Sequence, residues 1–114
     1  MNGKAILILT ALLAGCASVT TEPVPEIHAG FYRAGFEEDG FSPCESGEEW
    51  WVVDGQELRA RYAETAERDY EPVYAVVRGE TGPRGAFGHL GAYDRELRVT
   101  EVLEVRAPRE GDCG

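Results

Sequence analysis

A single helical pattern lies near the middle of a chain whose other apolar segments alternate as strands do. Leu58, Tyr62 and Ala66 recur at four-residue intervals and predict a helix over residues 55–67, packed by its Leu58–Tyr62 face. Asp54 precedes this pattern and is expected to cap the helix, because an aspartate oxygen accepts hydrogen bonds from free backbone N–H groups. One helix among strands favours a mainly β domain.

Three strand-like segments precede the helix. They are residues 30–36, which are rich in aromatic side chains, residues 41–44, and residues 50–53, which read Trp-Trp-Val-Val. Residues 37–40 are acidic and end in glycine, so we expect a turn between the first two strands.

Two further strands are expected after the helix. Val73, Ala75 and Val77 alternate with bulkier or charged residues and predict a strand over residues 73–78. The inward positions predicted for the last strand are Leu97, Val99, Leu103 and Val105. Glu101 interrupts that pattern, and a bulge or a barrel mouth at this point would let it reach water.

Glycine occupies every third position between these two strands. The glycines are Gly79, Gly82, Gly85, Gly88 and Gly91. Collagen needs many such triplets and three chains, and a phosphate-binding loop needs a helix after it, whereas a strand pattern follows here. We therefore predict a long connection, with Pro83 at a turn and with Phe87, Leu90 and Tyr93 folding back, and the alternative is a binding lip.

The predicted order of three strands, a helix and two strands resembles that of an OB barrel. That fold has five strands in a partly open Greek-key barrel, and its helix lies between the third and fourth strands. The resemblance implies a mainly β fold with one helix, a small five-stranded OB-like barrel.

The N-terminus resembles that of bacterial lipoproteins. An apolar run, Ala5–Leu13, follows Lys4 and is too short to span a membrane as a helix. It leads into Leu13-Ala14-Gly15-Cys16, which matches the lipobox, and the alternative is a secretory peptide with a chance cysteine. The resemblance implies cleavage before Cys16, followed by acylation of its sulfur and of the new amine, and a second or third acyl chain makes anchoring stable.

Cleavage would divide the chain into a signal peptide (1–15), a proline-bearing tether (16–27) and one folded domain (28–114). It would also remove the only lysine and leave ten arginines against 21 acidic residues. This charge opposes nucleic-acid binding. Acidic residues concentrate in residues 37–71, and a solvated acidic face or a weak divalent-cation site would both account for them.

Two cysteines remain after Cys16. In an oxidising envelope, Cys44 and Cys113 are most simply one disulfide, and the alternative is a thiol metal site without a second close ligand.

No catalytic constellation is visible, and no cofactor is expected. His28 and His89 have no ligand at metal-binding spacing and are expected to face solvent or form hydrogen bonds. Adjacent residues on a strand point to opposite faces, so either Trp50 or Trp51 belongs to the core, and the other is covered by a loop or exposed for a partner. The candidate residues for a ligand-binding face are Trp50, Trp51, Tyr74 and Phe87.

The envelope address and the OB-like order together resemble the NlpE family of outer-membrane lipoproteins, which are linked to surface sensing and copper stress. The Cys-x-x-Cys of that family is absent here, since Glu45-Ser46-Gly47 follows Cys44, so no metal role is carried over. We therefore expect a non-enzymatic interaction or structural module on the outer membrane, facing the periplasm, with another envelope protein as its partner. The alternatives are a module that binds a sugar, peptide or small apolar molecule, a stress or metal-related sensor, and a hydrolase.

Overall fold

The computed structural model describes residues 24–114, so the signal peptide and Cys16 lie outside the described residues. The elements are β1 (Glu26–Gly35), β2 (Glu38–Pro43), β3 (Trp50–Val53), α1 (Gln56–Thr65), β4 (Val73–Thr81), a short 3-10 helix η1 (His89–Gly91) and β5 (Arg95–Arg106). This order confirms the predicted one. Between residues 24 and 114, no helix is both long enough and apolar enough to cross a membrane.

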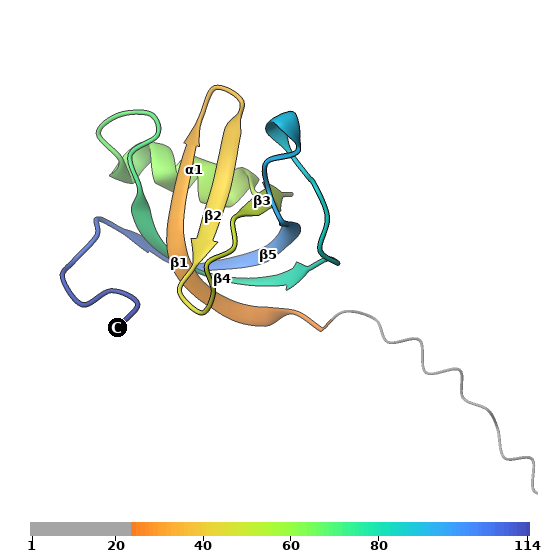
Figure 1. Ribbon diagram of the computed structural model, residues 1–114. Helices are drawn as coiled ribbons and strands as arrows, with labels where there is room; N and C mark the ends of the chain where they lie inside the picture. The colour runs from red at the N-terminus through yellow and green to blue at the C-terminus, as the bar shows by residue number, and fades with distance from the viewer. Residues whose placement is uncertain (1–23) are drawn as a thin grey trace, which may run out of the picture.

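The five strands close into a barrel in the order β1-β2-β3-β5-β4, and β4 pairs again with β1 (Figure 1). Four of the five pairings are antiparallel, and β3 runs parallel to β5. The parallel pair follows from the crossover through α1 and β4, which lets β5 enter beside β3 in the same direction. The predicted five-stranded barrel is confirmed.

Side chains fill the barrel. The largest fully buried ones are Tyr32, Phe41, Leu58, Leu97, Val73 and Val77. α1 packs on β5 and β1 through Leu58 and Tyr62, as predicted. The ring of Tyr62 meets that of Tyr32 edge-on, with centroids 5.4 Å apart.

The helix begins differently from the prediction. Gly55 precedes its first turn, and no side chain caps it. Asp54 has a positive φ of 54° and directs its carboxylate to Arg98 of β5 instead. The predicted Asp54 cap is therefore wrong, because the tight turn out of β3 points this side chain across the barrel wall.

The first hairpin is tighter than expected. Its turn is Phe36–Glu37, and β2 already begins at Glu38, so the prediction of a turn over residues 37–40 is wrong. β2 accommodates its acidic residues because β1 supplies donors to them: Arg33 Nε lies 2.5 Å from Glu38 Oε1. β1 itself begins at Glu26, two residues before the predicted domain boundary.

β5 contains two bulges, where the sequence predicts a bulge or a barrel mouth at Glu101, and they change which residues face inward. Val99 pairs with Gly79 and Glu101 with Arg78, so Thr100 is the extra residue of the first bulge. Val102 pairs with Val77 and Glu104 with Val76, so Leu103 is the extra residue of the second. Val102 is 8 % exposed and Leu103 is 39 % exposed. The prediction of Leu103 in the core is therefore wrong, since each extra residue shifts the two-residue period to the other face.

The chain after β5 returns to the barrel (Figure 1). Cys44 and Cys113 are joined by a disulfide, with their Cα atoms 5.0 Å apart. Arg106 supports this return: its Nη2 donates to Asp112 Oδ1 at 2.6 Å, and its guanidinium lies 4.2 Å from the centre of the Tyr74 ring. The hydrogen bond from Arg106 holds the pKa of Asp112 below its ordinary value.

Candidate interaction site

The four residues predicted for a ligand-binding face do not share one. Trp50 is 5 % exposed and stacks on Phe41 inside the barrel, so it is a core residue. Trp51 lies on the outer side of β3, and Tyr74 is on β4, which β5 separates from β3. Phe87 belongs to the β4–β5 connection. Alternation along β3 places the two indoles on opposite sides of the strand, and Trp50 is the one that points into the barrel.

The β4–β5 connection covers Trp51. The α-carbon of Gly88 is so close to the indole that an added Cβ would lie 2.4 Å from its Cε3. Tyr93 meets the same indole edge-on, with ring centroids 5.0 Å apart. Phe87 and Tyr93 form a backbone bridge and fold back as predicted, whereas Leu90 points into solvent. The glycine-rich segment is therefore a connection, and its close contact is internal.

The two histidines take different places. His28 is buried against Trp50, and its Nδ1 lies 2.9 Å from Glu45 Oε1, while its Nε2 has no hydrogen-bond partner among residues 24–114. His89 is exposed and its Nε2 lies 3.3 Å from Glu37 Oε2. In residues 24–114 no group of three or more histidine, cysteine or acidic side chains is placed to hold a metal ion.

Arginines pair with much of the acidic segment. Arg33 contacts Glu38 and Glu49, and Ser42 Oγ donates to Glu49 at 2.7 Å. Glu48 accepts from Arg95 at 2.9 Å, and this bond is the main reason why its pKa is lowered. These carboxylates therefore form ion pairs within the wall of the barrel.

Three connections meet at one end of the barrel. The β1–β2 turn lies between the α1–β4 connection and the segment that carries η1 (Figure 1). Tyr70 of the α1–β4 connection joins the turn through two hydrogen bonds: its backbone N–H donates to Ala34 O at 2.9 Å, and its hydroxyl donates to Phe36 O at 3.0 Å. The turn is therefore held in place at its base.

Large apolar side chains are exposed at this end. Phe36, at the tip of the β1–β2 turn, is 78 % exposed, and Leu90, in η1, is 89 % exposed. We name the end of the barrel that carries them the apolar end. Sequence reasoning did not identify either residue as functional; the only signal was that Gly88 and Gly91 flank Leu90.

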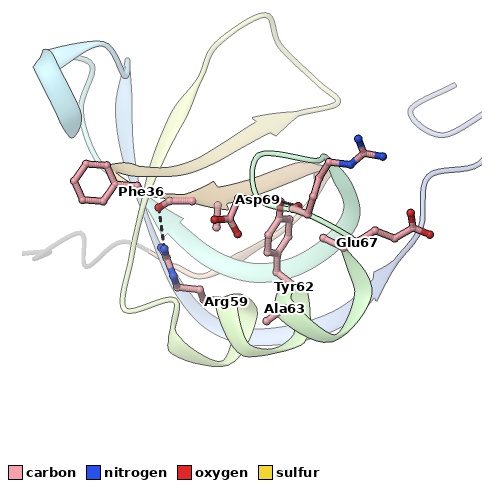
Figure 2. A pocket seen from close by; sticks show the side chains of 10 residues that line it. Phe36, Arg59, Tyr62, Ala63, Glu67 and Asp69 are labelled. Carbon is pink, nitrogen blue, oxygen red and sulfur yellow. Dashed lines mark hydrogen bonds between the residues drawn. The ribbon is translucent and has the colours of Figure 1, made fainter.

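A pocket of about 360 Å³ lies on the helix side of Phe36. Figure 2 shows Arg59 and Tyr62 on its helix wall and the Phe36 ring at its edge, turned outward. Its main donors are occupied: Arg59 Nη2 donates to Gly35 O at 2.9 Å, and Tyr62 OH donates to Glu71 O at 2.6 Å. This pocket is a polar gap between α1 and the β1–β2 hairpin.

Tyr32, whose ring contacts that of Tyr62, donates a hydrogen bond from its hydroxyl to Asp39 Oδ1 at 2.5 Å. Burial raises the pKa of both groups, and the Asp39 carboxylate further raises that of the Tyr32 hydroxyl. Arg59 also lies 3.5 Å from Asp39. Tyr32 is fully buried and the Asp39 side chain is partly exposed, so this hydrogen bond ties the barrel interior to the α1 side of β2.

A groove of about 380 Å³ lies on the other side of Phe36. Phe36 and Leu90 are the strongly exposed apolar residues among those that line it, and we name them its lips. Ala92 and Tyr93 also line it. The ionisable residues that line it are Arg33, Glu37, Glu38, Glu49 and His89. The groove therefore combines apolar lips with a wall in which carboxylates outnumber guanidinium groups.

Comparison with known proteins identifies the family. The model of the NlpE C-terminal OB domain matches residues 12–113. Among solved structures, that of the Cpx pathway activator NlpE from Escherichia coli is similar in fold, with a TM-score of 0.62 and 20 % sequence identity. The match covers 81 % of this chain and 44 % of that one, so this chain spans less than half of that protein. No curated protein sequence matches. The chain belongs to the NlpE C-terminal OB domain family.

Proposed function

We propose that this protein is a lipid-anchored component of envelope stress signalling that acts by contact with another envelope protein. Its family is that of an OB domain and is not a known enzyme family. The similar solved protein is described as an activator of the Cpx pathway. Together these favour a signalling role over a purely structural one.

The observation that carries this proposal is the exposure of Phe36 and Leu90 at the apolar end. In residues 24–114, the barrel interior is filled by the protein's own side chains. Two large apolar residues at loop tips lose stabilisation while they face water, and burial against a partner recovers it.

The proposed anchor places the apolar end away from the membrane. β1 has ten residues, and at about 3.3 Å per residue it separates Glu26 from the β1–β2 turn by about 30 Å. Acylated Cys16 precedes β1 in the chain, which would leave Phe36 facing the periplasm from an outer-membrane anchor.

Cys16→Ala tests the anchor itself. This variant is expected to lose labelling by a clickable palmitate analogue and to become soluble; continued acylation would contradict the anchor.

The test of function is an envelope-stress reporter in a bacterial host that expresses the full chain. The wild-type protein is expected to raise the reporter severalfold, Cys16→Ala to abolish the response, and Phe36→Ser to reduce it at equal protein level. Leu103→Ser is the matched control, because it removes an exposed apolar side chain from β5. An unchanged reporter, or an equal response to an unrelated lipoprotein at the same level, would contradict the proposal.

A further inference from the structure

We propose that the groove between Phe36 and Leu90 binds an extended peptide segment in which a bulky apolar residue and a lysine or arginine lie two positions apart, so that both side chains face the groove. This proposal rests on the proposed function and names the chemistry of the partner at the apolar end. The occupant is defined by the two properties of the groove, its apolar lips and its acidic wall.

Leu90 combines a strained backbone with an exposed apolar side chain. It adopts φ 57° and ψ 16°, a left-handed conformation that costs a residue other than glycine about 1–2 kcal/mol. Its side chain is almost fully exposed, so packing within the domain does not compensate for that cost. A strained backbone that presents an apolar side chain to water indicates a contact made outside the domain.

The floor of the groove is rigid. Tyr93 is buried against Trp51, and its backbone exchanges two hydrogen bonds with Phe87, at 2.9 and 3.1 Å. The backbone of the opposite lip, Phe36, is held by the hydrogen bond from Tyr70 to its carbonyl oxygen. A preformed groove of about 380 Å³ lies within the range of ligand pockets and has room for a leucine or phenylalanine side chain.

The wall carries an excess of negative charge. Three carboxylates, those of Glu37, Glu38 and Glu49, face one guanidinium, that of Arg33, which already pairs with Glu38 and Glu49. Glu37 contacts His89, which offsets its charge only when protonated. A cationic side chain beside the apolar one would meet Glu37 and would also be attracted by the acidic domain.

The same charge argues against two other occupants. A second copy of this chain would bring three more carboxylates to the groove, and like charges in contact repel. An anionic lipid surface would be repelled for the same reason. A peptide segment of another envelope protein that is both basic and apolar complements the apolar lips and the acidic wall.

Synthetic fluorescent peptides test the inference against the full-length protein in zwitterionic nanodiscs. The probe repeats Leu-Ser-Lys-Ser, which places leucine and lysine on the same face of an extended chain. One analogue replaces lysine by glutamate, and another replaces leucine by serine. Fluorescence polarisation is expected to show binding of the first peptide and at least tenfold weaker binding of both analogues. Higher salt should weaken binding of the first peptide, because charge contributes to it.

Variants locate the contact. Leu90→Ser is expected to weaken binding of the lysine–leucine peptide at least tenfold and Glu37→Gln about threefold, whereas Leu103→Ser leaves it unchanged. Leu90 and Glu37 are both exposed, so their substitutions should leave the stability of the domain unchanged, and unchanged melting temperatures would verify this. Equal binding by wild type and Leu90→Ser, equal weakening by Leu103→Ser, or binding by empty nanodiscs would overturn the proposal. So would concentration-dependent self-association that Leu90→Ser abolishes, since the groove would then hold a second copy.

The two proposals fail separately. A reporter that responds while the peptide does not bind would overturn the groove assignment and leave the signalling role. A peptide that binds through Leu90 while the reporter stays silent would overturn the signalling role and leave the groove.

Discussion

Gly88 lies directly against Trp51, and an added Cβ would come within 2.4 Å of the indole. Its φ of 67° and ψ of −158° belong to a region that glycine alone adopts readily. This contact fixes the start of η1, and thereby Leu90, over β3. A glycine in the β4–β5 connection thus sets the position of one lip of the groove.

Gly88→Ala is therefore expected to destabilise the domain by about 1–3 kcal/mol, since both the backbone and the contact with Trp51 become unfavourable. The melting temperature should fall by roughly 4–8 °C for each kcal/mol. Gly82→Ala is the matched control in the same connection, because nothing lies within 4 Å of its added Cβ. Equal melting temperatures for the two variants would contradict the contact.

The disulfide gives the second prediction. Cys44 and Cys113 are 69 residues apart, and closing a loop of this size stabilises a fold by about 2–4 kcal/mol. Cys44→Ala, Cys113→Ala and the double variant are each expected to lose the same amount in urea unfolding, because each removes the same crosslink. A non-reduced digest should show the two cysteine peptides linked. Free alkylation of both thiols without reduction would refute the bridge.

The buried Tyr32–Asp39 pair predicts a pH-dependent effect. Tyr32→Phe removes the donor to a partly buried carboxylate and should cost about 1–3 kcal/mol near neutral pH. Burial raises the pKa of Asp39 and the bond from Tyr32 opposes that rise, so the bond favours the ionised form. Its stabilisation is therefore present above the pKa of Asp39 and shrinks as the pH falls through it.

Urea unfolding of Tyr32→Phe at neutral pH and at about pH 4, where aspartate ordinarily titrates, checks this sign. Tyr74→Phe is the control, because no hydrogen bond of the Tyr74 hydroxyl is present in residues 24–114. A deficit that grows on acidification would contradict the assigned role of Tyr32.

The second bulge in β5 predicts a contrast between neighbours. Val102→Ala is expected to cost about 1.5–3 kcal/mol, because it removes buried methyl groups and leaves a cavity. Leu103→Ala removes a larger side chain from the surface and should stay within about 0.5 kcal/mol. Chemical denaturation of the two variants measures the difference, and the reverse order would place the bulge elsewhere.

Local pattern alone determined the order of the elements and the buried face of α1. The four-residue spacing of Leu58 and Tyr62 marks a helix wherever it lies, and alternation in Val73–Val77 marks a strand. The cysteine count likewise predicted the pair that the structure joins. These features depend on residues close in sequence or on the simple number of thiols.

Only the tertiary structure decided which tryptophan of β3 faces the core, which residues of the second half of β5 do so, and what lies at the apolar end. Trp50 and Trp51 are equivalent in sequence, and barrel closure places the first inside and the second under Gly88. Val102 replaces Leu103 in the core because β4 and β5, which are far apart in sequence, pair with two register shifts, at Thr100 and at Leu103. Such choices depend on register between distant segments, and a single inserted residue reverses every side chain beyond it.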